Sequence, residues 1–114
     1  MGIGQSLASA ASPVRVVWAD SAVTDLDAIQ GYYRDVVGSP HAAANVGRAI
    51  LAAGDALDVL PLRGQRQADG TYEFPVLAYP QFRLIYRVDE VAGQVGIAHV
   101  ETTRTVVPRP AARK

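Results

Sequence analysis

The segment FRLIYRV, residues 82–88, constrains the fold of this chain more than any other stretch. Two sets of side chains alternate along it: Phe82, Leu84, Tyr86 and Val88 on one side, and Arg83, Ile85 and Arg87 on the other. A period of two residues is typical of a strand in a sheet with one covered face. The segment therefore requires a second layer over its apolar set, and it leaves two permanent cations on the opposite face.

Two helices are predicted upstream of this strand, and they supply the covering layer. Asp20 and Ser21 offer N-cap oxygens for the first helix. Its apolar residues recur at intervals of three and four, as in one helical stripe: Ala22, Leu26, Ile29, Tyr33 and Val36. Gly38-Ser39-Pro40 ends this helix and suits the start of the next. The second helix is predicted from about Pro40 to Leu60, and so short a connection predicts an antiparallel hairpin.

Four segments are predicted to be strands: 14–19, 71–78, 82–89 and 94–103. The links between the last three are short enough for antiparallel hairpins, and residues 61–70 are predicted to form a turn-rich loop. Pro75 cannot donate a ladder hydrogen bond, so its strand is expected at an edge or with a bulge. The order β-α-α-β-β-β predicts the α+β class, with an N-terminal helical hairpin packed on a small antiparallel sheet. The predicted core combines both layers: Leu26, Ile29, Tyr33, Val46, Ile50, Leu57, Leu84, Tyr86 and Val88.

The chain has 114 residues, enough for one domain with one core. We expect this domain at residues 14–107, between a flexible N-terminal tail at 1–13 and a C-terminal tail at 108–114. No apolar run approaches the roughly 20 residues that span a bilayer. The N-terminus lacks the charged and apolar regions of a secretory signal, and the chain has no cysteine. We therefore expect a soluble, cytoplasmic protein with no membrane partner.

No pattern for metal, cofactor or nucleophile chemistry is present in the sequence. His41 and His99 are the only histidines, and neither has carboxylates at the spacing of metal ligands. A G-x-S-x-G elbow and a glycine-rich phosphate loop between strand and helix are both missing. We expect no metal and no cofactor, and we expect His99 to be a satisfied core or half-buried residue.

Charge is unevenly distributed, although the net charge is zero. Residues 1–60 carry three arginines against six aspartates, a net charge of −3, and residues 61–114 carry seven arginines and one lysine against five carboxylates, a net charge of +3. Guanidinium suits bidentate contacts with carboxylate or phosphate. Ordinary scatter of surface charge and an arginine bias from GC-rich coding are the alternative interpretations. The candidates for contact with an anionic partner are Arg63, Arg66, Arg83, Arg87 and Arg104.

Together these pieces resemble the RelE/ParE superfamily of toxins from type II toxin–antitoxin systems, over about residues 15–107. The first helix has an A-x-x-DL-x-x-I-x-x-Y-like pattern at Ala22, Asp25, Leu26, Ile29 and Tyr32/Tyr33. L-x-x-x-P-x-x-G-x-R follows at Leu57, Pro61, Gly64 and Arg66, FRLIYRV is close to YR-[IL]-[IV]-YRV, and V-x-x-x-x-R runs from Val100 to Arg104. The resemblance implies two N-terminal helices on an antiparallel sheet, in agreement with the order predicted independently above.

The resemblance also implies one of two activities. RelE-like members are ribosome-dependent ribonucleases that cut mRNA with basic residues on the sheet, including an arginine that matches Arg83; Arg104 would belong to the same catalytic set. This chain has Glu73 and Pro75 on the strand that carries their lysine pair, has no tyrosine after Tyr86, and is neutral rather than strongly basic. ParE-like members lack that catalytic set and poison DNA gyrase. We therefore expect a ParE-like, non-enzymatic growth inhibitor, with a ribosome-dependent mRNA endoribonuclease as the alternative.

A cognate antitoxin is the expected partner, with gyrase, or alternatively the ribosome and mRNA, as the target. Trp18 and Tyr32 join the five arginines as candidate antitoxin or target contacts, because aromatic residues are common in interfaces. The alternative for these aromatics is a place in the core. We expect Arg83 and Arg87 to face outward on the concave side of the sheet, and the alternative for them is an ion pair with Glu73 or Glu101 on a neighbouring strand.

Overall fold

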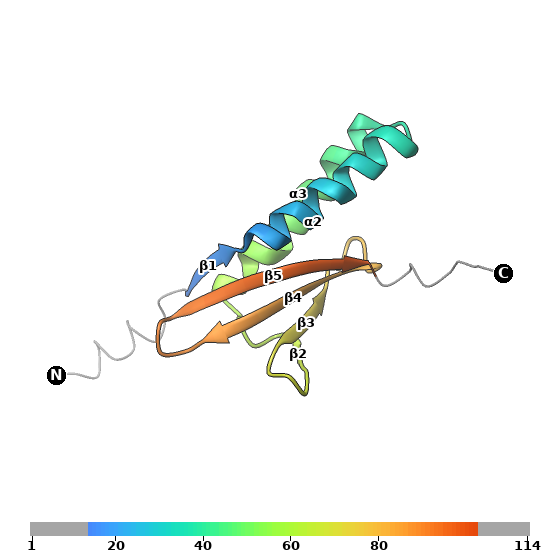
Figure 1. Ribbon diagram of the computed structural model, residues 1–114. Helices are drawn as coiled ribbons and strands as arrows, with labels where there is room; N and C mark the ends of the chain where they lie inside the picture. The colour runs from blue at the N-terminus through green and yellow to red at the C-terminus, as the bar shows by residue number, and fades with distance from the viewer. Residues whose placement is uncertain (1–13, 103–114) are drawn as a thin grey trace.

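One mixed sheet and a helical hairpin make up the fold in a computed structural model that describes residues 14–102 (Figure 1). The elements in chain order are β1 (Arg15–Trp18), α2 (Asp20–Gly31), the π-helix η1 (Tyr32–Val36), α3 (Pro40–Asp55), the 3-10 helix η2 (Ala56–Asp58), β2 (Gln65–Arg66), β3 (Tyr72–Pro75), β4 (Phe82–Asp89) and β5 (Gln94–Thr102). The two helices lie side by side over one face of the sheet (Figure 1). This is the predicted α+β arrangement.

The five strands follow the order β1-β5-β4-β3-β2. Strands β3 to β5 pair antiparallel, as predicted, and the short β2, which was not predicted, pairs antiparallel with β3. Strand β1 adds to β5 in parallel, whereas the sequence predicted an antiparallel sheet. The parallel pair makes the sheet mixed, because β1 reaches β5 through the whole domain rather than through a hairpin. The predicted loop at 61–70 contains the two-residue strand β2, which pairs with Tyr72 and Glu73.

The predicted strand at 71–78 is shorter than expected, because a turn begins after Pro75. The Tyr79 amide donates to the Val76 carbonyl at 2.8 Å, which reverses the chain toward β4. Since β2 covers only the first half of β3, Pro75 lies on an uncovered stretch of edge, as predicted for a residue with no N–H. Strand β4 has the predicted bounds, and β5 follows the predicted segment through Thr102, the last described residue.

The helix ends differ in part from the prediction. Ala19, without a side-chain hydrogen bond, is the N-cap of α2, so Asp20 and Ser21 do not cap it as expected. Ser39 caps α3 as predicted, and its hydroxyl oxygen accepts from the Ala42 amide at 3.0 Å. The second helix ends at Asp55 and continues as η2 rather than running to Leu60.

The core lies between the hairpin and the sheet. Six of the nine predicted core residues are buried: Leu26, Val46, Ile50, Leu57, Leu84 and Tyr86. The other three, Ile29, Tyr33 and Val88, are half-buried and pack against them. The apolar set of β4 therefore faces the helices, which confirms that the alternation in FRLIYRV determines the two layers.

The free edge of β5 is closed by helix α2. Strand β1 pairs with β5 only through Ile97, and the backbone bond from the Ala19 amide to the Ile97 carbonyl, 2.9 Å, is the last of that ladder. One step further, the Ser21 hydroxyl donates to the Ala98 carbonyl at 2.6 Å. The Asp25 carboxylate then accepts from the Val100 amide at 3.0 Å. Two side chains one helical turn apart thus replace a neighbouring strand.

The first prediction tests the buried face of α3. Ile50 is 0% exposed, so Ile50→Ala should lower the free energy of unfolding by about 2–5 kcal/mol through lost burial and the cavity that remains. Val91 is 100% exposed at the β4–β5 turn, and Val91→Ala should change it by no more than about 0.5 kcal/mol. Urea unfolding measures both. A loss under about 1 kcal/mol for Ile50→Ala would contradict this packing.

The second prediction tests the closure of the β5 edge. Asp25→Ala removes the acceptor of the Val100 amide, and a hydrogen bond to a charged group contributes about 1.5–3 kcal/mol. Asp27 lies on the same helix with an exposed side chain, so Asp27→Ala is the matched control and should change stability by less than about 0.5 kcal/mol. The amide exchange rate of Val100 should rise in the first variant alone. Equal losses of stability in both variants would argue against the edge contact.

Candidate functional site

The sheet face opposite the helices carries Arg83, Ile85 and Arg87, the second set of side chains in β4. Arg83 does not point freely into solvent: its Nη1 atom donates to Glu73 Oε1 on β3 at 2.6 Å. This is the ion pair named above as the alternative for Arg83. The two side chains retain 43% and 26% of their exposure, so we treat the pair as a local neutralisation of charge rather than as a large source of stability.

Arg87 is exposed and touches the β2–β3 turn. Its Nη1 atom lies 3.4 Å from the Asp69 carbonyl oxygen. The Asp69 carboxylate accepts from the hydroxyl and the amide of Thr71 at 2.6 and 2.9 Å. These hydrogen bonds, with a smaller contribution from the Arg87 charge, lower the pKa of Asp69 below its ordinary value. Asp69 therefore stays an anion beside Arg87 down to lower pH than a free aspartate.

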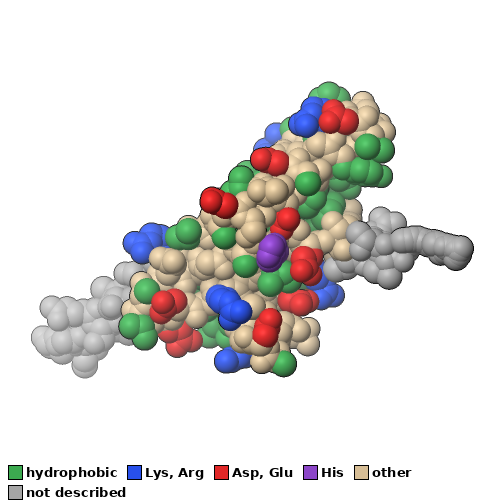
Figure 2. Space-filling model, in the orientation of Figure 1, with side chains coloured by type: hydrophobic (Ala, Val, Ile, Leu, Met, Phe, Trp, Pro, Cys, Tyr) green, Lys and Arg blue, Asp and Glu red, His purple; other side chains and the backbone are tan. Residues whose placement is uncertain are grey.

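Acidic residues flank both arginines. Glu101 on β5 lies directly across from Arg83 in the strand register, on the opposite side from Glu73. Figure 2 shows basic and acidic side chains interspersed over this view of the molecule, with no continuous basic area. The five groups Arg83, Arg87, Glu73, Glu101 and Asp69 carry two positive and three negative charges. Such a face attracts a polyanion weakly.

The other three candidate arginines are separated from this pair. The guanidinium of Arg63 lies over the Phe74 ring, 4.2 Å from its centroid, in a cation–π contact. Arg66 is exposed on β2. Arg104 lies outside the described residues. The structure therefore brings Arg83 and Arg87 together on one face, as expected, but does not join Arg63 to them.

A buried tyrosine holds the loop that carries Arg63 and Arg66. The Gly64 amide donates to the Tyr86 hydroxyl at 3.0 Å, and Tyr86 stacks on Tyr72 with ring centroids 5.5 Å apart. A Cβ at Gly64 would lie only 2.6 Å from that hydroxyl, which explains the glycine. Burial raises the pKa of Tyr86 above its ordinary value of 10.0. The sequence contains a signal for this contact, since Gly64 and Tyr86 stand in two of the matched motifs, but spacing alone does not pair them.

Trp18 belongs to the packed interior more than to the surface. It is half-buried against the core, and its indole N–H lies 3.3 Å from Asp55 Oδ1. A Cβ on Gly54 would approach the Trp18 ring to 2.3 Å, so the glycine makes room for it. Of the two interpretations of Trp18, a place in the core fits these contacts better than a contact with a partner.

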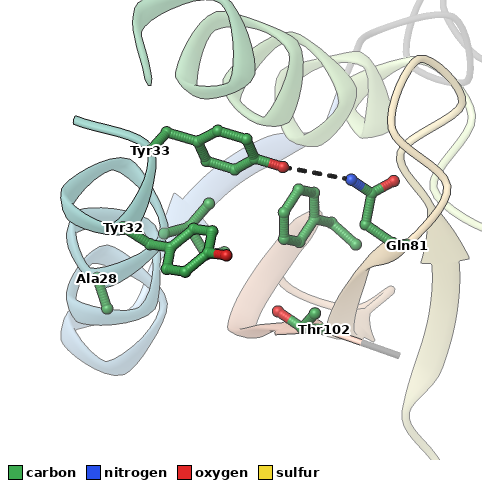
Figure 3. A pocket seen from close by; sticks show the side chains of 7 residues that line it. Ala28, Tyr32, Tyr33, Gln81 and Thr102 are labelled. Atoms are coloured by element: carbon green, nitrogen blue, oxygen red, sulfur yellow. Dashed lines mark hydrogen bonds between the residues drawn. The ribbon is translucent and has the colours of Figure 1, made fainter. Parts of the chain in front are cut away.

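Tyr32 lies at the rim of an apolar pocket of about 510 Å³, which we call the tyrosine pocket. Figure 3 shows Tyr32 and Tyr33 turned toward it from the hairpin, with Gln81 and Thr102 opposite. The Tyr33 hydroxyl accepts from Gln81 Nε2 at 3.4 Å, and the Tyr33 ring meets Phe82 edge-on. Both tyrosines belong to the π-helix η1, an irregularity that is frequent at functional sites. Tyr32 is 54% exposed, so its ring is accessible to a partner.

Residues 14–102 contain no group of three or more histidine, cysteine or carboxylate side chains that could hold a metal ion. His99 Nδ1 lies 3.0 Å from Asp25 Oδ2 and keeps 50% of its side-chain exposure. It is satisfied, as predicted, but more exposed than predicted. Within the same described range, no helix is long and apolar enough to cross a membrane.

The family model of the ParE toxin of the type II toxin–antitoxin system parDE matches residues 16–106. The chain belongs to the ParE toxin family. This membership agrees with the first-helix pattern and with the two-layer order of the fold. No curated protein sequence matches the chain.

Solved toxin–antitoxin structures share this fold. The chromosomal ParDE system from Pseudomonas aeruginosa aligns with a TM-score of 0.69 at 20% identity, over 80% of this chain and 97% of that chain. The RelBE2 complex from Mycobacterium tuberculosis aligns with a TM-score of 0.57 at 25% identity, over 80% and 92%. The archaeal RelE–RelB complex from Pyrococcus horikoshii aligns with a TM-score of 0.56 at 17% identity, over 82% and 98%. The ParE-family chain therefore has the fold common to both branches of the superfamily.

The third prediction concerns Tyr86. Tyr86→Phe leaves the Gly64 N–H without its acceptor and should cost about 1 kcal/mol of stability near neutral pH. Since the folded pKa is raised above the unfolded value of about 10, the unfolded chain loses the Tyr86 proton first as pH rises. Wild-type stability should then fall as pH rises from that value through the folded pKa.

The difference in unfolding free energy between wild type and Tyr86→Phe separates the titration of Tyr86 from that of the other tyrosines. Urea unfolding at a series of alkaline pH values should show the advantage of wild type over Tyr86→Phe shrinking above about pH 10. A difference that stays constant with pH would mean that the hydroxyl is not buried in the folded chain.

Proposed function

We propose that this ParE-family protein is the toxin of a type II toxin–antitoxin module, that it inhibits growth by poisoning DNA gyrase, and that a cognate antitoxin neutralises it. Its membership of the ParE family supports the toxin assignment. The solved relatives are toxin–antitoxin complexes, which supports an antitoxin as the partner. Gyrase is the target that the ParE-like branch implies.

The observation that carries the choice of target is the Arg83–Glu73 pair. A ribonuclease of the RelE type needs free cations to activate a 2′-hydroxyl and to stabilise the charge that develops on phosphorus. Here the matching arginine is bound by a carboxylate at 2.6 Å, and a second carboxylate, Glu101, lies across from it on β5. The strand next to it offers Glu73 and Pro75 where the nucleases carry lysines. This face is therefore better suited to protein contacts than to phosphoryl chemistry.

The tyrosine pocket is the surface that we assign to the antitoxin first. It is apolar and partly open, and the rim residue Tyr32 is exposed. Aromatic residues at such sites contribute large contact areas at a low cost in side-chain entropy. Trp18, the other aromatic candidate, packs against the core. Tyr32 is therefore the better candidate for an antitoxin contact.

The fourth prediction tests the target. Wild type, Arg83→Ala and Arg87→Ala are expressed without the antitoxin, and growth, gyrase supercoiling in vitro and ribosome-dependent mRNA cleavage are measured. We expect wild type to arrest growth and inhibit supercoiling without cleaving mRNA. If the two arginines contact gyrase, both variants should lose inhibition while their urea unfolding stays close to that of wild type.

Glu73→Gln is the matched control, because it releases Arg83 without removing it. It should leave gyrase inhibition intact, since the cation remains in place. Codon-specific mRNA cleavage by wild type that disappears in Arg83→Ala would instead assign the protein to the nuclease branch. Growth arrest with neither activity would contradict both targets.

A further inference from the structure

A gap between side chains lies over Gly96 on the open face of the sheet, and we call it the Gly96 notch. In the strand register, Gly96 stands directly between Val17 of β1 and Arg87 of β4. A Cβ built at Gly96 would meet nothing within 4 Å beyond its own chain neighbours. Because neighbouring strands lie about 5 Å apart, the Cα atoms of Val17 and Arg87 are about 10 Å from each other. The notch therefore has a backbone floor and one side chain on either side.

Both flanking side chains belong to the face that the helices leave uncovered. Val16 and Trp18 pack against the core, so Val17 between them points to the opposite side of β1. Its side chain is 41% exposed. Arg87 lies on the same side of the sheet and is exposed as well. The notch thus combines an apolar side chain with a permanent cation.

Arg87 differs from Arg83 in what stands beside it. Arg83 donates to Glu73 at 2.6 Å, and Glu101 lies across from it on β5. The residue across from Arg87 on β5 is Gly96, which has no side chain. Within residues 14–102, Arg87 makes no ion pair. Arg87 is therefore the cation of this face that is open to a carboxylate from another molecule.

The β2–β3 turn holds Arg87 at the side of the notch. Its Nη1 atom lies 3.4 Å from the Asp69 carbonyl oxygen. Thr71, which is only 7% exposed, fixes the turn because its hydroxyl and its amide both donate to the Asp69 carboxylate. A guanidinium has five N–H donors, so one contact with a carbonyl leaves donors for a bidentate carboxylate.

The notch suits one carboxylate better than a polyanion. Binding of a nucleic-acid backbone requires several neighbouring cations, and the notch offers one. The acidic neighbours of Arg83 also make the rest of this face unfavourable for phosphates. An acidic side chain of a protein can bind Arg87 through its carboxylate while its methylene groups cover Val17.

We propose that the Gly96 notch receives one acidic side chain of gyrase, whose carboxylate binds Arg87 and whose methylene groups pack on Val17. This inference rests on the proposed function, because it takes gyrase as the target. It names the chemistry of one contact with that target, and it gives the absence of a side chain at residue 96 a role in binding.

Two substitutions of Gly96 test the notch. Gly96→Glu fills it and places a carboxylate beside Arg87, whereas Gly96→Gln fills the same volume without charge. The backbone of Gly96 is not in the left-handed region and the space above it is open, so urea unfolding should show both variants folded. The toxin concentration that halves supercoiling by the gyrase holoenzyme should rise about tenfold or more for Gly96→Glu, and less for Gly96→Gln.

Val91→Glu is the control for charge. It makes the same change at the β4–β5 turn, where Val91 is 100% exposed, and it should leave the inhibitory concentration unchanged. Equal losses in Gly96→Glu and Gly96→Gln would mean that volume alone matters and would overturn the acidic partner group.

Binding without DNA identifies the source of the anion. The affinity of the toxin for the gyrase holoenzyme is measured by surface plasmon resonance at several salt concentrations. Wild-type affinity should fall as salt rises, and Arg87→Ala should bind more weakly and with less dependence on salt. Wild type that binds a DNA duplex in the absence of gyrase, and loses that binding in Arg87→Ala, would assign the notch to a phosphate and overturn the proposal.

The failures of the two proposals can be told apart. If Gly96→Glu inhibits gyrase as strongly as wild type, the notch is overturned and gyrase remains the target. If wild type neither binds nor inhibits gyrase, the proposed target is contradicted and the notch with it.

Discussion

The closure of the β5 edge by α2 is the contact on which the rest of the fold depends. Strand β1 pairs with β5 only as far as Ile97 of β5. The chain then turns into α2, while β5 continues to Thr102 with no strand beside it on that edge. Ser21 and Asp25 then bind the next backbone groups of β5 at 2.6 and 3.0 Å. Because the two side chains lie one turn apart, they fix the rotation of α2 about its axis. That rotation places Ala22 and Leu26 over the sheet, and α3 follows from the short connection.

Placing both helices on one face leaves the other face of the sheet open, and its charges determine what it can do. The two arginines of β4 would form a basic stripe in isolation. Glu73 binds Arg83, and Glu101 lies opposite it on β5. The Asp69 carboxylate, whose pKa is lowered by hydrogen bonds from Thr71, lies beside Arg87. The acidic neighbours therefore break up the basic stripe that Arg83 and Arg87 would otherwise form on this face.

The two-layer fold could be predicted because its determinants are local. Alternation in FRLIYRV, three- and four-residue spacing in the helices and the Gly38-Ser39-Pro40 connection each act within a few residues. The contacts that the sequence did not reveal join distant segments: Asp25 with Val100, Gly64 with Tyr86, and Arg63 with Phe74. Asp20 and Ser21 show why local patterns do not predict such contacts. Their oxygens suit an N-cap, but the nearby edge of β5 offers Ser21 a carbonyl, and tertiary structure decided its role.

Pro75 shows how one edge of the sheet is protected. It lies beyond the stretch of β3 that β2 covers, and it has no N–H to offer an incoming strand. The edge of β5 is protected differently, because the Ser21 and Asp25 side chains of α2 bind backbone groups that β1 leaves unpaired. A missing donor therefore protects β3, whereas side-chain hydrogen bonds from the helical hairpin protect β5.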